Sequence, residues 1–142
     1  MCDFPMVRSG AHVFQAAPVF LLYGKHWGKH KGFGVVHILA EHANEIPLVK
    51  SIARVVPRCP KTPTPQAVLA VSRFVAAICT RKADIACEFA GMIGNHRPII
   101  IKTYAGTVIL EYRICTESNS PYYSVVTAMS STKAKGSVIG SL

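Results

Sequence analysis

Acidic residues are scarce in this chain of 142 residues. Seven Asp and Glu stand against sixteen Lys and Arg, which gives a formal net charge of +9 at pH 7. So few carboxylates argue against an acidic cluster that holds magnesium. The basic excess is spread along the chain, so it predicts a folded surface that meets phosphates or an acidic protein partner.

Cysteines with metal-binding spacing are also missing. The five cysteines are scattered, and no Cys-x-x-Cys pair occurs. An odd, scattered set argues against a disulfide framework and against a zinc site built from cysteines. We expect reduced and mostly buried thiols.

Long apolar runs and nucleotide-binding loops are absent as well. No apolar run reaches the ~18 residues of a membrane span. Residues 1–22 lack the layout of a signal peptide, since Asp3 is acidic. The motifs GxxxxGKS/T, GxGxxG and GxSxG do not occur. The sequence therefore predicts no membrane contact, no cofactor and no serine hydrolase.

The length and the hydrophobic half of the composition fit one domain with a full core. Residues 1–22 predict a lead-in segment with an extended stretch at 11–22. Residues 23–142 predict a single domain.

Apolar spacings of three and four predict the helices. One begins at Val35 and ends near Pro47, and a short one covers 47–56. A firmer helix covers 66–80, preceded by Thr64 as a cap and Pro65 at the first helical position. Residues 57–65 contain four prolines and predict a loop.

In the last third of the chain, apolar and polar residues alternate as they do in β-strands. Turn signals separate four candidates, at 84–91, 98–104, 107–116 and 122–130. Helices followed by such a meander predict an α+β fold, with N-terminal helices packed on a C-terminal four-stranded antiparallel sheet.

A hairpin turn at Ala105-Gly106 sets Lys102 opposite Ile109. In that register the buried face of the hairpin is apolar, formed by Ile99, Ile101, Val108, Leu110, Tyr112 and Ile114. The exposed face is polar, formed by Lys102, Tyr104, Glu111 and Arg113.

The stretch 31–42 combines a basic, glycine-bearing loop with a helix that carries two histidines. Its glycines permit a tight turn and close approach to a ligand, and the helix N-terminus favours an anion. His37 lies one turn into the helix and can exchange protons near neutral pH. Glu41 shares its face. His42 follows five residues later, about 140° around an ideal helix, so one of the two histidines at most faces a given cleft.

His26 and His30 of the preceding loop compete for the same role. For each histidine the alternative is an ordinary core or surface position. Metal binding is the weaker interpretation, because His37 and His42 lack the HExxH spacing. Gly28 between His26 and His30 indicates a loop. We therefore expect no metal site.

The loop over 23–34 interleaves aromatic and basic residues, namely Tyr23, Trp27 and Phe33 with Lys25, Lys29 and Lys31. This pattern suits base stacking combined with phosphate contact. An ordinary loop anchored by its aromatic side chains fits the pattern equally well.

These groups form a set for metal-free RNA cleavage. One group, with His37 the first candidate, would remove the 2′-OH proton, and a cation such as Lys102 or Arg113 would stabilise the phosphorane charge. Another group would protonate the leaving 5′-oxygen or position the phosphate. The products are a 2′,3′-cyclic phosphate and a 5′-hydroxyl. Tyr123 and Ser130 of the last strand are candidates for RNA contact. For each polar strand residue the alternative is a solvated face.

The stretch GKHKGFGVVHILAEHANEI resembles the opening motif of phage- and toxin-associated nuclease domains of the barnase–EndoU–colicin–RelE superfamily. In those domains a GFG-type loop leads into a helix with His-Ile and a second histidine. The closing stretches VVT and KAKGSVIG are similar too, so the resemblance spans residues 23–142. The histidine arrangement of the EndoU subgroup is not found in this sequence.

The resemblance implies a toxin that cleaves RNA, often tRNA, in the cytoplasm of a target cell. Such toxins are often the C-terminal module of a larger delivery or phage protein and are countered by an acidic immunity protein. It implies His37 and His42 as the helix histidines, Lys102 or Arg113 as the sheet cation, and Thr127 as the last-strand hydroxyl.

Two other classes fit the same features. The first is a non-catalytic RNA-binding or phage structural module, and the second is a nucleotide-modifying transferase. Salt-sensitive RNA binding without a cut product favours the first, and modified but intact tRNA favours the second.

Overall fold

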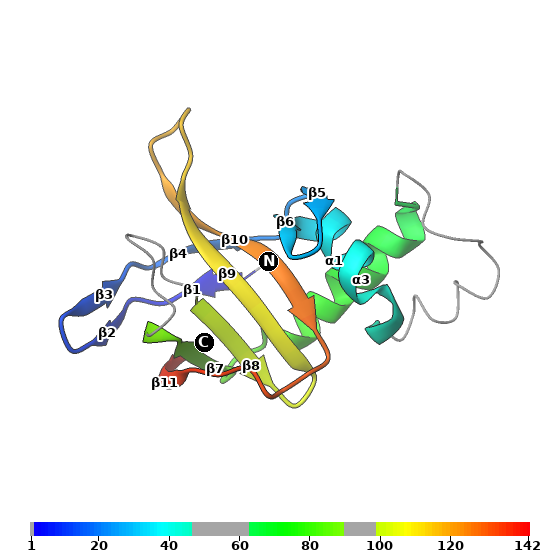
Figure 1. The fold of residues 1–142 in the computed structure, drawn as a ribbon. Coiled ribbons are helices and arrows are strands. Elements are labelled where there is room, and N and C mark those ends of the chain that lie inside the picture. Colours follow the sequence, from blue (N-terminus) through cyan, green and yellow to red (C-terminus); the bar gives the residue numbers. More distant parts are fainter. Residues whose placement is uncertain (1, 47–62, 90–98) are drawn as a thin grey trace.

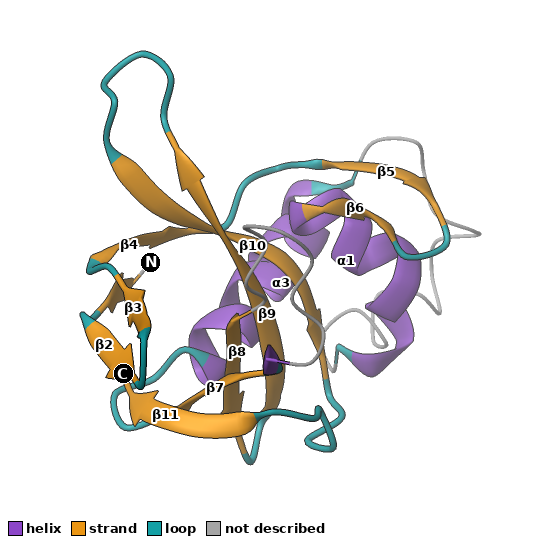
Figure 2. Ribbon diagram, turned by 60° about the vertical axis from the view of Figure 1, so that its left-hand side comes forward, coloured by secondary structure: helices purple, strands orange, loops and turns teal. Residues whose placement is uncertain are grey.

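A computed structural model gives the structure of residues 2–46, 63–89 and 99–142 (Figure 1). The helix expected over 47–56 and most of the loop expected over 57–65 lie outside these described residues. In both ribbon views the two main helices gather on one side of a strongly curled sheet (Figures 1 and 2).

The sheet has seven strands and mixed direction. From edge to edge these are β1 (Cys2–Phe4), β4 (Ala17–Phe20), β10 (Pro121–Met129), β9 (Gly106–Ile114), β8 (Ile99–Thr103), β7 (Asp84–Cys87) and β11 (Ser137–Ser141). β4 runs parallel to β10, and all other neighbours are antiparallel. Two hairpins stand apart from this sheet, β2 (Val7–Ser9) with β3 (His12–Phe14), and β5 (Lys25–Gly28) with β6 (Lys31–Phe33).

The predicted arrangement of N-terminal helices on a four-stranded antiparallel sheet is wrong. β1 and β4 come from the segment 1–22, which was expected to lead into the domain, and β11 adds a strand at the opposite edge. These strands have three to five residues each, too few for a period of two to stand out in a sequence. Tertiary pairing places them, as where Val19 pairs with Tyr123.

The four predicted C-terminal strands are confirmed as β7, β8, β9 and β10. The turn between β8 and β9 lies one position earlier than predicted. Thr103 pairs with Gly106, and Lys102 lies opposite Thr107 instead of Ile109. The pairing has shifted by two residues, and an even shift leaves every side chain on its predicted face.

The faces therefore follow the prediction over most of the hairpin. Ile99, Ile101, Val108 and Leu110 are buried in the core. Tyr112 and Ile114 lie on the same side of β9 but are exposed, because β9 and β10 continue beyond the core as a projecting hairpin (Figure 2).

The helices begin where the sequence predicts. α1 (Gly34–His42) continues into the 3-10 turn η1 (Ala43–Glu45), and α3 (Pro65–Ile78) forms the second long helix. The Oγ1 atom of Thr64 accepts the Ala67 N–H at 3.2 Å and caps α3. α1 packs on β10 and on α3, while α3 packs on β8 and β9. Within the described ranges, neither helix has the length and apolar character needed to cross a bilayer.

Candidate active site

The junction between the β5–β6 hairpin and α1 is built around glycines. Gly32 has φ +153°, and a Cβ there would lie 2.4 Å from the Lys25 carbonyl oxygen and 2.7 Å from Nδ1 of His37. Only glycine fits so close to the hairpin backbone and the imidazole. The glycine of the loop thus allows the hairpin to lie directly on the ring of His37.

The N-terminus of α1 is closed by the chain that precedes it. The N–H groups of Val35 and Val36 donate to the carbonyls of Leu22 and Tyr23, each at 3.0 Å. Two of the donors that an anion would use are therefore already bonded. The predicted anion site at this helix terminus is not supported.

The hairpin brings His26 against His37. Their Nδ1 atoms lie 3.0 Å apart, and their ring centroids are 5.3 Å apart. His37 is buried, with 4% of its surface exposed, whereas His26 is only partly buried. His26 is therefore the more solvent-accessible residue of the pair.

This contact fixes complementary tautomers. A neutral imidazole carries one N–H and one lone pair, so one Nδ1 must donate and the other must accept. The donating ring then has a lone pair at Nε2, and the accepting ring has an N–H at Nε2. The pair therefore offers one base and one acid on its two remaining nitrogens.

Glu41 completes the cluster from the next turn of α1. One carboxylate oxygen accepts the backbone N–H of His30 at 2.7 Å, and the other lies 3.4 Å from Nδ1 of His30. The bond from the His30 backbone lowers the pKa of Glu41, with burial opposing it. Burial lowers the pKa of His37, and the Glu41 charge opposes that shift. The net result is a pKa of His37 below the usual value of a histidine.

His42 has a different setting at the end of α1. Its Nδ1 contacts a carboxylate oxygen of Glu45, whose other oxygen accepts the backbone N–H of Ser130 at 3.0 Å and its hydroxyl at 2.9 Å. Burial would raise the pKa of Glu45, but the bonds from His42 and Ser130 outweigh it and lower the pKa. This cluster attaches the end of α1 to the end of β10.

The two predicted sheet cations lie far apart. Lys102 donates to the Ala134 carbonyl at 2.8 Å and pairs with Thr107. Thr107 is six residues from Arg113 along β9, about 20 Å at the rise of a strand. A single phosphate cannot contact both cations.

Arg113 is the predicted sheet cation that contacts the β5–β6 hairpin. Its guanidinium lies 5.2 Å from the centroid of the Phe33 ring, and Phe33 is the residue that precedes α1. The same guanidinium donates to Glu111 from Nε at 2.9 Å and from Nη2 at 2.7 Å. Arg113 is therefore held beside the hairpin by a carboxylate and an aromatic ring.

The hydroxyl-bearing residues of β10 differ in their hydrogen-bond partners. Thr127 and Ser124 are buried, and their hydroxyl oxygens have no hydrogen-bond partner among the described residues. Both lie on the polar face of β9 and β10, since Ser124 pairs with Glu111. Tyr123 is 1% exposed and donates its hydroxyl to the Gln15 carbonyl at 2.7 Å. Its predicted contact with RNA is wrong, because it fills the core.

The lysines and the aromatic residue predicted to contact RNA lie on the β5–β6 hairpin. Lys25, Lys29 and Lys31 are exposed, and Trp27 is 67% exposed. The Trp27 ring lies 6.2 Å from the Phe33 ring, centroid to centroid. The hairpin that carries His26 thus also carries three exposed cations and an exposed indole.

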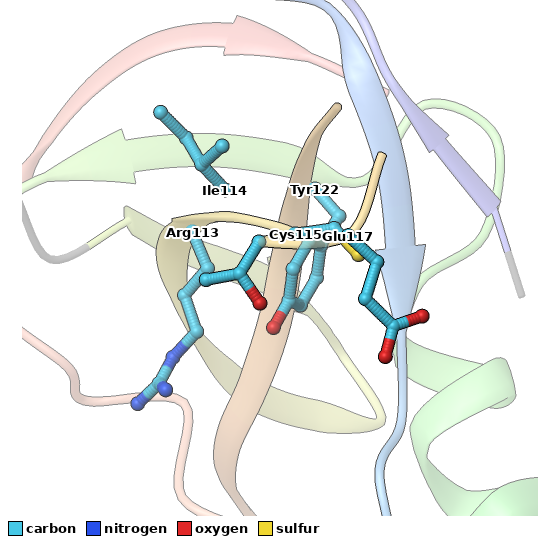
Figure 3. Close-up of a pocket in the computed structure, with 6 residues that line it drawn as sticks. Arg113, Ile114, Cys115, Glu117 and Tyr122 are labelled. Carbon is cyan, nitrogen blue, oxygen red and sulfur yellow. The ribbon is translucent and has the colours of Figure 1, made fainter. Parts of the chain in front are cut away.

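A separate hollow of about 490 Å³ lies near the tip of the β9–β10 hairpin. It is lined by Arg113, Ile114, Cys115, Thr116, Glu117 and Tyr122. In Figure 3 the Tyr122 ring lies between the side chains of Arg113 and Glu117. The hollow is open to solvent, and Arg113, one of its lining residues, also contacts the Phe33 ring of the β5–β6 hairpin.

From the sequence, His26 is only a rival of His37, and Glu41 has no role beyond its helix face. A signal for His26 is present, since Gly32 in the second strand of a tight hairpin lies opposite residue 26 and beside the start of α1. Comparison with known proteins adds no family: no family model, no curated protein and no solved structure matches this chain.

Proposed function

We propose that this protein is a metal-independent endoribonuclease, with tRNA its favoured substrate, that cleaves by attack of the 2′-OH on the adjacent phosphorus. The observation that carries the proposal is the 3.0 Å contact between Nδ1 of His26 and Nδ1 of His37, beneath a hairpin with exposed lysines. Proton exchange on both sides of a phosphate requires one base and one acid, and the pair supplies both.

The two imidazoles can supply and accept every proton that this reaction transfers. The ring with a free Nε2 lone pair takes the 2′-OH proton, the 2′-oxygen bonds to phosphorus, and the bond to the 5′-oxygen breaks. The other ring gives its Nε2 proton to that oxygen. The proton between the two Nδ1 atoms moves to the second ring, so both imidazoles end neutral with their tautomers exchanged. Exchange with water restores the starting state.

The surroundings fit a polyanionic substrate. Lys25, Lys29 and Lys31 supply phosphate contacts, and Trp27 supplies a stacking surface for a base. Of the two predicted sheet cations, Arg113 is the one that contacts this hairpin, through the Phe33 ring. We assign Lys102 no role in the cleavage reaction. The net charge of +9 also suits an acidic inhibitor protein, as the resemblance to toxin nucleases implies.

The test is incubation of the protein with end-labelled total RNA in EDTA, beside DNA of a matching sequence. We expect RNA fragments that end in a 2′,3′-cyclic phosphate and no cut DNA, because DNA lacks the 2′-OH. The His12→Gln variant is the control, since His12 lies on β3 against Phe89. Salt-sensitive RNA binding without cut product would replace the enzyme by a binding module, and cleavage abolished by EDTA would indicate a metal nuclease.

A further inference from the structure

The cluster that holds the proposed acid and base also has the donor set of a transition-metal site. His26, His37 and Glu41 each offer one ligand atom, and these atoms all lie within 4.8 Å of one another. Two imidazoles and one carboxylate, with a fourth position open to water, form a common zinc environment. Mg²⁺ and Ca²⁺ require oxygen ligands instead.

The spacing of the two imidazoles fits one ion. Zinc–nitrogen bonds of about 2.0–2.1 Å at a tetrahedral angle place two nitrogens about 3.3 Å apart. The Nδ1 atoms lie 3.0 Å apart, so a few tenths of an ångström of separation are enough. His37 and Glu41 are four apart on α1, which sets both side chains on one helix face.

Gly32 lets the hairpin that carries His26 approach the ring of His37. A Cβ at this position would lie 2.7 Å from Nδ1 of His37 and 2.4 Å from the Lys25 carbonyl oxygen, so a side chain there would push the two ligand nitrogens apart. One oxygen of Glu41 is oriented by the His30 N–H at 2.7 Å. Hydrogen bonds of this kind orient ligands around bound metals.

We propose that Zn²⁺ binds between Nδ1 of His26, Nδ1 of His37 and the carboxylate of Glu41, and that it switches off RNA cleavage. The binding site stands on its own geometry, whereas the inhibition rests on the proposed function. Zinc on both Nδ1 atoms breaks the bond between the rings. The ring that donated moves its proton from Nδ1 to Nε2, so both rings then carry N–H at Nε2 and no base remains.

The binding arm of the test needs no enzymatic activity. Isothermal titration with Zn²⁺, and Co²⁺ titration followed by visible d–d absorption, should each give one ion per chain. His26→Gln and Glu41→Gln should each lower the affinity at least about tenfold, since even indirect ligand contacts have effects of this size. His12→Gln and Glu117→Gln are the matched controls and should bind as the unmodified protein does. Equal affinity in all five proteins would overturn the site.

The inhibition arm uses the same preparations and RNA. Cleavage should fall in step with zinc occupancy and return when EDTA is added. Zinc binding with unchanged or increased cleavage would overturn the inhibitory role and leave the site intact. Absence of cleavage under every condition would end the proposed function, while the titrations would still decide the metal site.

Discussion

Two histidines on one short helix have very different surroundings. His37 is buried against a second imidazole, whereas His42 contacts a carboxylate that is itself bound to the end of β10. The Glu45 carboxylate can accept from Nδ1 of His42 and links it to the sheet, whereas the contact between His26 and His37 couples the tautomers of two rings. Under the proposed function, proton transfer therefore belongs to His37 with His26, and His42 attaches the helix to the sheet.

The largest effect is expected from His37→Asn. The asparagine amide retains a polar group where Nδ1 contacts His26 but has no counterpart of Nε2. RNA cleavage should fall by about 10²–10⁴-fold, the usual contribution of a positioned acid or base. The melting temperature should change little. His42→Asn should reverse the pattern, with lower thermal stability and most of the turnover of the folded enzyme retained.

Gly32→Ala tests how His37 is positioned. Its Cβ would meet the Lys25 carbonyl oxygen at 2.4 Å and Nδ1 of His37 at 2.7 Å, so the hairpin must move off the ring. We expect a loss of about 1–3 kcal/mol in the free energy of unfolding together with reduced cleavage.

Gly28→Ala is the matched control for that change. Gly28 has φ +156°, close to that of Gly32, but its Cβ would meet nothing within 4 Å. Gly28→Ala therefore introduces the same backbone strain as Gly32→Ala but no contact with the imidazole of His37. If Gly28→Ala reduced cleavage as much as Gly32→Ala, contact with the imidazole would not be the cause.

Glu45→Gln should weaken the attachment of α1 to β10. Glutamine is neutral, so the two hydrogen bonds from Ser130 and the contact with His42 lose their charged acceptor. This change should lower the free energy of unfolding by about 1–2 kcal/mol near neutral pH. Because the folded pKa of Glu45 is lowered, this stabilisation is present above pH 4.5 and is lost as the pH falls through the folded pKa. Chemical denaturation at pH 7 and at acid pH measures both, and an equal difference at the two values would contradict the assignment.

The smallest effect is a shift of the pH profile in Glu41→Gln. The Glu41 charge raises the pKa of His37 against the lowering by burial. Without that charge the pKa falls further, so the acid limb of cleavage should move to lower pH. A limb that moved to higher pH would contradict the contact between Glu41 and the histidine pair.

The sequence predicts local features better than their assembly. Thr64 and Pro65 define the start of α3, and the apolar alternation in β8 and β9 identifies the buried face, because these signals lie within a few residues. The seven-stranded sheet depends on pairs such as Val19 with Tyr123, which leave no local pattern.

The candidate site divides in the same way. A titratable group at His37 follows from its place after a glycine-bearing loop. Its partner His26, eleven residues earlier, depends on how the hairpin folds back. The separation of Lys102 from Arg113 likewise depends on where Arg113 and Thr107, the partner of Lys102, lie along β9, which a shared face does not define.

The proposed chemistry requires that the rings of His26 and His37 share one proton between their Nδ1 atoms. Long-range proton–nitrogen NMR of the nitrogen-15-labelled protein at neutral pH reads the tautomer of each imidazole. We expect complementary tautomers, with a protonated Nδ1 in one ring and a protonated Nε2 in the other, and His37→Asn should abolish the difference. The same Nε2–H tautomer in both rings, unchanged by EDTA, would contradict the account.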